Sequence, residues 1–247
     1  MREAGPPFYV TVPAPCPYLP DRRERRLVAF LDELPAGFFD LLTELGFRRS
    51  QRFVYRPDCP ACRACVPVRI RVRDFHWSRT FRRVRRRNAD LGVRERPPVA
   101  DREQYALFRR YVEARHAGGG MHGMDWEEYR ALVEEAGPDT RLVEFRTPDG
   151  RLAAVSLTDH VRSGLSGVYK FFDPALEARS PGTFVVLWHV LRAGELGLPY
   201  VYLGYWIRDC RKMRYKARYR PLERLGPDGR WHPFAPDEDP AAASHTP

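Results

Sequence analysis

The feature that most restricts the fold is a block of three strand-like runs joined by short turns. The runs RLVEFR (141–146) and RLAAVSLTD (151–159) flank the turn sequence TPDG, which is typical of a β-hairpin, and LSGVYKFF (165–172) follows as a third run. An apolar helix is expected from about Gly182 to Leu196, before a last strand in PYVYLGYWI. This order favours an antiparallel-rich α+β domain.

Two amphipathic helices are expected before this block. The apolar residues from Tyr105 to Val112 mark the first helix, and the second begins at Asp125, where Glu128 three residues later fits a capping box. Nearer the start of the chain, the apolar residues of 25–45 indicate two short helices, because Pro35 and a following glycine interrupt the pattern.

A pair of prolines, Pro97 and Pro98, gives the best domain boundary. We therefore expect a smaller α+β N-terminal domain over 1–97 and a C-terminal domain over 98–235. The composition of 236–247 predicts a flexible tail.

Positive charge is concentrated in the N-terminal half. The net charge is +10, and arginines crowd the segment between Arg63 and Arg96. In VPVRIRVR (66–73) apolar residues alternate mainly with arginines, which predicts a strand with one buried and one basic face. SRTFRRVRRRNADL (78–91) predicts a basic helix capped by Ser78 and closed by Gly92. Such a block can contact RNA phosphates, and a solvated basic face without a partner is the alternative.

Three of the five cysteines stand together in CPACRAC, as Cys59, Cys62 and Cys65. With Cys16 they have the donor chemistry of a zinc or iron–sulfur site, whereas thiols that only pack a loop are the alternative. An odd number of cysteines argues against a secreted disulfide framework. No apolar run reaches the length of a membrane span and no secretory signal is recognisable, so we expect a cytoplasmic protein without a membrane partner.

Five strings carry a resemblance to a known family. They are GFRRSQRFVYRPDCPACRACVPVRI (46–70), SRTFRRVRRRNADL (78–91), GLSGVYKFFDP (164–174), ARSPGTF (178–184) and YVYLGYWIRDCRKMRYKARYRPLE (200–223). In this order and spacing they resemble the bacterial aspartate/glutamate leucyltransferases, relatives of eukaryotic arginyl-tRNA–protein transferases. The resemblance extends from about Cys16 to Trp231.

The resemblance implies a C-terminal domain similar to the acyltransferase (GNAT) fold and a particular reaction. The α-amine of a protein that begins with Asp or Glu attacks the ester carbonyl of leucyl-tRNA, and the added leucine marks the protein for degradation. The partners are then leucyl-tRNA and such proteins, and no small cofactor is required. The chain departs from the family pattern at Gln51, where glycine is common, at Pro181, where leucine is usual, and at Gly167, where serine is common.

An aminoacyl ester is already activated, so the enzyme has mainly to position two reactants and stabilise an oxyanion. The attacking amine, with a reference pKa of about 7.7–8.0, must first lose a proton. Asp173 is the candidate base and Tyr169 a candidate helper, with a turn cap and a core tyrosine as the alternatives. Lys212 is the third catalytic candidate; it would share a helix face with Lys216, a candidate substrate-binding residue.

Further candidate binding residues form two groups. The first is a polar cluster in which an arginine can bind the acidic side chain bidentately, and either this cluster or the lysine pair is expected to hold RNA instead. It comprises Arg48, Arg49, Ser50, Tyr55 and Arg56. The second is Arg179, Ser180 and Gly182, before the apolar helix, where backbone amides can attract an anion or simply belong to a helix cap. Tyr205 is a candidate for stacking on the terminal adenine.

Three other functions fit parts of the sequence. Arginine is the rival donor, but few acids stand near the expected pocket, which favours leucine. A coenzyme A-dependent N-acetyltransferase would use the same fold, although Phe184 replaces the last glycine of the pattern R-x-x-G-x-G. An RNA-binding adaptor would explain the basic helix alone and leave RSPG and KMRYK without a role.

Overall fold

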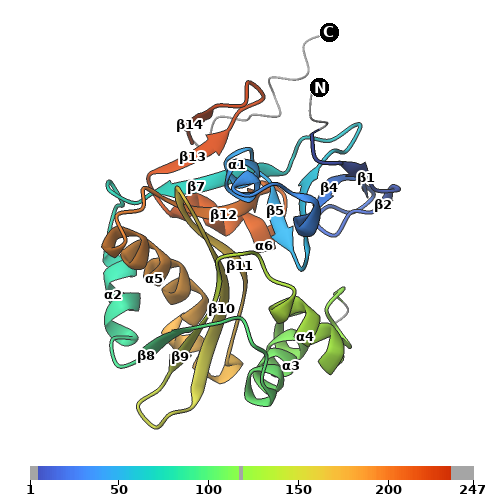
Figure 1. The fold of residues 1–247 in the computed structure, drawn as a ribbon. Coiled ribbons are helices and arrows are strands. Elements are labelled where there is room, and N and C mark those ends of the chain that lie inside the picture. Colours follow the sequence, from blue (N-terminus) through green and yellow to red (C-terminus); the bar gives the residue numbers. More distant parts are fainter. Residues whose placement is uncertain (1–4, 117–118, 235–247) are drawn as a thin grey trace. The chain divides into compact units, whose positions relative to one another are not determined.

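The chain leaves its first structural unit and later returns to it. A computed structural model describes residues 5–116 and 119–234. Residues up to His76 together with those from Pro199 onward form the first unit, and Trp77–Leu198 form the second (Figure 1). These units differ from the expected linear division at residue 97, because strand β12 (Tyr200–Trp206) pairs antiparallel with strand β7 (Val66–Arg71). The expected tail over 236–247 lies outside the described residues.

The first unit begins with a small antiparallel sheet in the order β1-β4-β6-β5. Its strands are β1 (Tyr9–Val10), β4 (Arg26–Phe30), β6 (Phe53–Pro57) and β5 (Arg48–Ser50). Between β1 and β4 in the chain, β2 (Ala14–Pro15) and β3 (Arg23–Glu24) form a separate two-stranded ribbon. Of the two helices expected in 25–45, only the second exists, as α1 (Phe38–Glu44). The first expectation is wrong because its apolar residues belong to β4 and the short 3₁₀ helix η1 (Leu31–Glu33).

The same unit contains a further set of antiparallel strands, which pair in the order β14 (Trp231–Pro233), β13 (Leu222–Leu225), β7 and β12. The short helices α6 (Arg211–Arg214) and η3 (Tyr215–Arg218) stand between β12 and β13 in sequence. Val66, Val68 and Ile70 are buried on β7, as the alternation predicted. The opposite face is not uniformly basic and exposed. Arg69 is buried because its guanidinium pairs with Glu223 at 2.7 Å and lies over aromatic rings of the sheet.

The second unit is built on an antiparallel meander. Strands β8 (Gly92–Arg96), β9 (Thr140–Arg146), β10 (Leu152–Val161) and β11 (Gly164–Phe172) pair in this order, so the predicted hairpin and third strand are confirmed. Helices α3 (Arg102–His116) and α4 (Trp126–Glu134) pack on one face, and the apolar helix α5 (Pro181–Glu195) packs on β10 and β11 with the basic helix α2 (Arg79–Arg87) beside it. The structure mixes helix and sheet, and one core cluster of this unit lies between α3, α4 and the strands β9, β10 and β11.

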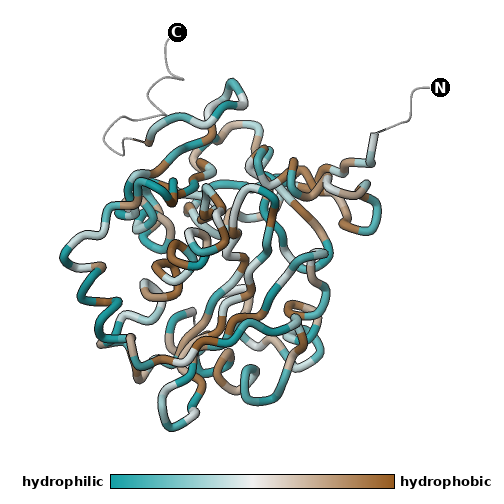
Figure 2. The backbone as a smooth tube through the Cα atoms, turned by 60° about the vertical axis from the view of Figure 1, so that its left-hand side comes forward, coloured by the Kyte–Doolittle hydropathy of each residue, from teal (hydrophilic) through white to brown (hydrophobic). Residues whose placement is uncertain are grey.

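Local signals fix several helix ends as expected. The Ser78 hydroxyl accepts a hydrogen bond from the Phe81 amide at 3.2 Å, and Asp125 and Glu128 form a complete capping box. The expectation that Gly92 closes α2 is wrong. Asn88 ends the helix, and Gly92 begins β8. Along the tube of Figure 2, hydrophobic residues occur in short stretches broken by hydrophilic ones. Among the described residues, none of the helices combines the length and the hydropathy that crossing a bilayer requires.

Candidate functional site

The four cysteines of the predicted metal site line a single cavity in the first unit. Cys16, Cys59, Cys62 and Cys65 share this cavity with three tyrosines, and the arginines Arg22, Arg23 and Arg26 also line it. The sequence therefore correctly placed the thiols together, although Cys16 is 43 residues from Cys59 in the chain. We call this feature the cysteine cavity.

The cysteine cavity has the chemistry of a soft-metal site but not its arrangement. All of its thiols are free, and burial, together with the neighbouring Cys16 and Cys62, raises the pKa of Cys65 to about 12. Within 5–116 and 119–234, no group of three or more His, Cys, Asp or Glu side chains is arranged to hold a metal ion. The thiols as placed do not fit a zinc ion or an iron–sulfur cluster.

A charged pair in the cysteine cavity carried no motif in the sequence and was missed. Arg26 contacts Glu24 at 2.5 Å, and its guanidinium lies 5.0 Å from the centre of the Tyr55 ring. Burial raises the pKa of Tyr55 despite the nearby Arg48 and Arg26, so its phenol stays protonated. In the sequence, the only sign of this pair is that Glu24, in β3, and Arg26, in β4, carry opposite charges and are separated by one residue.

The predicted arginine cluster on β5 and β6 is divided among different environments. Arg48 lies against Gly204, where an added Cβ would stand 2.9 Å from its Nε atom. Arg49 is only 5% exposed and donates to the backbone carbonyl of Gln51 at 3.0 Å, whereas Arg56 is exposed, 5.1 Å from the Phe47 ring centre. These arginines therefore do not converge on one ligand as a set.

Two further residues, Ser50 of this cluster and Gln51 beside it, have structural roles. Ser50 ends β5, partly buried, opposite Phe53. Gln51 follows in the left-handed region with φ 50°, which explains physically why a glycine suits this turn.

Tyr205 is part of the core of the first unit. Its hydroxyl is within 3.0 Å of the Gly46 carbonyl oxygen and 3.1 Å of that of Tyr55, and the residue is 3% exposed. Burial raises its pKa well above the ordinary value. The ring is therefore not presented for stacking on a base, and the alternative of a core strand tyrosine describes it better.

Lys212 and Lys216 do not share a helix face. Helix α6 ends at Arg214, and the chain continues as the 3₁₀ helix η3, so the four-residue spacing no longer places the two side chains together. Lys212 is exposed, whereas Lys216 is 7% exposed and donates to the backbone carbonyl of Tyr205 at 2.5 Å. Lys216 thus holds the end of β12 through its backbone contact, and Lys212 remains a candidate for contact with substrate.

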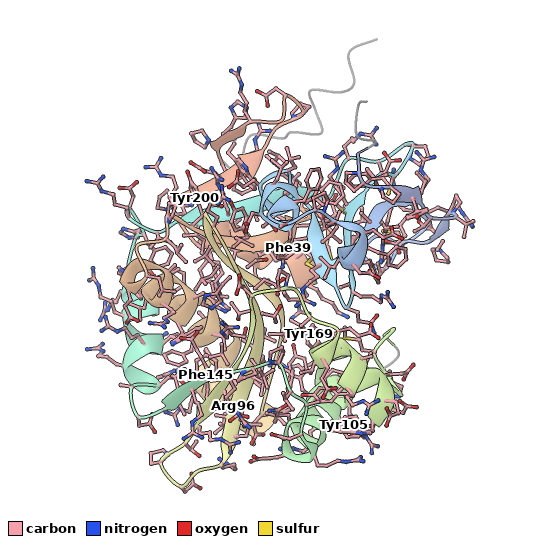
Figure 3. All side chains as sticks on the ribbon, viewed as in Figure 1. Phe39, Arg96, Tyr105, Phe145, Tyr169 and Tyr200 are labelled. Atoms are coloured by element: carbon pink, nitrogen blue, oxygen red, sulfur yellow. The ribbon has the colours of Figure 1, made fainter. Side chains whose placement is uncertain are left out.

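In the second unit, Tyr169 lies in the last part of β11, and Asp173 directly follows this strand. One carboxylate oxygen of Asp173 accepts a hydrogen bond from the Ala175 amide at 3.0 Å and caps the 3₁₀ helix η2 (Pro174–Arg179). Tyr169 lies on the same side of the sheet as Tyr105 (Figure 3), with its ring centre 6.1 Å from that of Phe108, and its hydroxyl has no hydrogen-bond partner among the described residues. Burial raises its pKa, so this phenol is a poor base.

The turn before α5 is built around glycine and a strained serine. Ser180 has φ 56° and its side chain caps nothing, while a Cβ on Gly182 would stand 2.9 Å from the Phe172 ring. The amides of Thr183 and Phe184 both donate to the Ser180 carbonyl at 3.0 Å. Because Pro181 has no amide hydrogen, little of the expected anion-binding amide cluster remains.

Arg179 faces the neighbouring basic helix. Its guanidinium donates to the backbone carbonyl of Arg87 at 3.0 and 2.5 Å and pairs with Asp90, and this hydrogen bond lowers the Asp90 pKa. Arg179 therefore fixes the end of α2 in this structure.

A buried polar network under α5 was missed by the sequence analysis. His189 is 2% exposed, and its Nε2 atom lies 2.9 Å from the Thr158 hydroxyl and 3.4 Å from that of Ser156. Burial, and secondarily Lys170, lowers the pKa of His189 to about 3, so the imidazole is neutral. The only signal was the alternation of polar residues in β10, which by itself is typical of a solvent-facing strand.

Comparisons with known proteins cover both parts of the chain. Residues 14–83 match the family described as "Arginine-tRNA-protein transferase, N terminus", and residues 103–226 match its C terminus. A protein of Paramagnetospirillum magneticum named aspartate/glutamate leucyltransferase is 50% identical over 94% of this chain and 95% of its own length. One of the same name from Parvibaculum lavamentivorans is 52% identical over 94% of this chain and 97% of its own length.

Among solved structures, L-PGS from Bacillus licheniformis aligns at 10% identity with a TM-score of 0.44, over 73% of this chain and 52% of that protein. A similarity this low carries no argument about function. The sequence relationship to the two named leucyltransferases does carry such an argument, because about half of the aligned residues are identical along almost the full length of this chain and of each relative. The chain belongs to the aspartate/glutamate leucyltransferases, within the arginine-tRNA-protein transferase family.

Proposed function

We propose that this enzyme transfers leucine from leucyl-tRNA to the N-terminal Asp or Glu of proteins. The observation that carries the proposal is the match to named leucyltransferases at about half identity across both family halves. We further propose that the second unit works as an acyltransferase (GNAT)-like domain, supported by its antiparallel meander followed by α5. The expected setting is the cytoplasm, where the added leucine would mark the acceptor for degradation.

The proposed reaction needs only the two substrates. The acceptor α-amine, after losing a proton to water or a nearby base, attacks the carbonyl carbon of the leucyl ester. A C–N bond forms, the C–O ester bond breaks, and the 3′-terminal ribose oxygen of the tRNA leaves and takes up a proton. Positioning and oxyanion stabilisation therefore supply most of the acceleration, since the ester is already activated.

The described contacts support different roles for the candidate residues. Lys212 is exposed and forms no hydrogen bond or ion pair among the described residues, so it is available to a carboxylate or phosphate. Arg48 lies partly buried beside Tyr55 and Gly204, a setting that suits recognition of one acidic side chain. We propose Lys212 and Arg48 as substrate contacts and Lys216 as the residue that holds the end of β12.

An acceptor series tests the proposal. Purified protein and leucyl-tRNA are incubated with peptides that differ only in the first residue: Asp, Glu, Asn, Gln, and N-acetylated Asp. Transfer to Asp and Glu alone, measured by mass spectrometry, supports the proposal. Equal transfer to Asn and Gln would contradict recognition of the acid, and transfer to the acetylated peptide would contradict attack by the α-amine.

A further inference from the structure

The basic helix α2 divides its arginines into two groups by their position around the helix axis. Phe81, Val84 and Asn88 are buried and define its inner face. At 100° per residue, the positions opposite that face are 79, 82, 83 and 86. All four are exposed arginines: Arg79, Arg82, Arg83 and Arg86. We call them the α2 stripe; the seven rises from residue 79 to residue 86 make it about 10 Å long along the axis.

The remaining arginines of the helix make contacts with other residues of the second unit. Arg85 lies 5.8 Å from the Trp77 ring centre, and Arg87 donates to the Ala178 carbonyl at 3.1 Å. The α2 stripe, by contrast, makes no ion pair within the described part of the chain, and the helix contains no acidic residue. Four like charges in two turns repel one another, so the protein itself gains nothing from this arrangement.

The far end of the helix is held in place independently of the stripe. Arg179 donates to the Arg87 carbonyl, and the Asn88 side chain donates to the carbonyls of Val84 at 2.8 Å and Arg179 at 2.9 Å. A cation at a helix C-terminus is also favourable for the helix dipole. These bonds fix α2 to the turn that begins α5, so the stripe is a preformed surface of the second unit.

We propose that the α2 stripe binds phosphates of the acceptor stem of the donor RNA, an inference that rests on the proposed function. Charge complementarity requires a polyanion, and arginines in a row match successive phosphates rather than a single carboxylate. The only aromatic residue within α2, Phe81, is buried, so the helix offers no stacking platform for unpaired bases. Contacts to the backbone of a duplex are what remain.

The test compares two variants with the same loss of charge. In the stripe variant, Arg82, Arg83 and Arg86 are each replaced by Gln. In the control variant, the exposed Arg94, Arg109 and Arg110 of the same unit are replaced by Gln. Thermal unfolding checks both folds, and the single substitutions R82Q and R86Q serve if the stripe variant does not fold.

Two substrates separate stem binding from chemistry. One is full leucyl-tRNA and the other is a leucyl ester of a short CCA oligonucleotide, which lacks the stem. For the stripe variant we expect the KM for leucyl-tRNA to rise about 10- to 100-fold, and the slope of log affinity against log salt to fall by about 2 to 3, at roughly 0.7–0.9 per lost phosphate contact. Transfer from the oligonucleotide ester and all constants of the control variant should stay within about twofold.

Either of two results would overturn the inference: an unchanged KM and salt slope in the stripe variant, or an equal loss with the oligonucleotide ester. Binding of uncharged tRNA, measured by fluorescence anisotropy, keeps the inference separate from the proposed function. If the wild-type protein transfers no leucine but the stripe variant still loses tRNA affinity selectively, the proposed function fails and the RNA surface stands. If the stripe variant loses affinity for acidic peptides instead of tRNA, the surface has been assigned to the wrong partner.

Discussion

The ammonium group of Lys216 lies 2.5 Å from the backbone carbonyl oxygen of Tyr205, at the end of strand β12. The same tyrosine extends its hydroxyl to the Gly46 carbonyl at 3.0 Å, so one residue connects the KMRYK segment, β12 and the loop after α1. The two lysines of the motif therefore do different work: one joins parts of the first unit, and the other is exposed.

Replacing Lys216 by Met should destabilise the protein. The substitution keeps most of the apolar stem but leaves the Tyr205 carbonyl without its charged donor, which is expected to lower the free energy of unfolding by about 2 kcal/mol. Urea unfolding measures the change. Lys212→Met, at an exposed position, is the matched control and should stay within about 0.5 kcal/mol of wild type. Equal stability of both variants would show that the buried bond is unimportant.

Lys212→Ala should impair transfer while the fold survives. We expect kcat/KM for the peptide or for leucyl-tRNA to fall about tenfold or more, because an exposed cation in this place is available to a substrate anion. Lys212→Arg should restore part of the activity. Wild-type rates in Lys212→Ala would remove this residue from the site.

The stability of the protein should fall in mild acid because of His189. Its folded-state pKa, lowered to about 3 by burial, is below the ordinary value of 6.5, so the stability linked to the neutral ring is complete above pH 6.5 and is lost as pH falls toward 3. Between pH 7 and pH 5 this amounts to about 2 kcal/mol. Urea unfolding at both values should show a smaller loss in His189→Gln, and an identical loss in the variant would contradict the assignment.

Asp173→Asn separates a turn cap from a general base. The amide oxygen of Asn can still accept the hydrogen bond from Ala175, but the side chain cannot take a proton. Since the observed contact is the cap, we expect transfer within about threefold of wild type, whereas a general base contributes about a hundredfold or more. A hundredfold loss of kcat in a folded variant would make Asp173 the base. Asp173→Ala should cost about 1 kcal/mol of stability.

Much of the second unit followed from the sequence because its signals are local. The TPDG turn, the capping box at Asp125 and the Ser78 cap each act within a few residues, and the structure contains all of them. The early strand β4 was mistaken for a helix, since its apolar spacing fits both periods and only pairing with β6 decides between them.

The site was harder to predict because burial of polar residues depends on distant partners. Lys216 and Tyr205 were expected to contact substrate. Each is instead buried and donates a hydrogen bond to a backbone carbonyl, a contact that no sequence motif indicates. Arg179 likewise meets Arg87, which is 92 residues away in the chain. His189 itself gave no signal, since a histidine in an apolar helix fits an ordinary core position, and only the alternating polar residues of β10 pointed to its network. Sequence patterns located the segments of the site, whereas which side chains remain accessible follows only from packing.

The most direct test of the central claim is the mass of a product. A peptide that begins with Asp is incubated with the purified protein and, in separate reactions, leucyl-tRNA, arginyl-tRNA or acetyl-coenzyme A. We predict an increase equal to one leucine residue with leucyl-tRNA only. A mass increase with arginyl-tRNA alone would contradict leucine as the transferred residue. An increase equal to an acetyl group, or no increase with any donor, would contradict the proposed aminoacyl transfer.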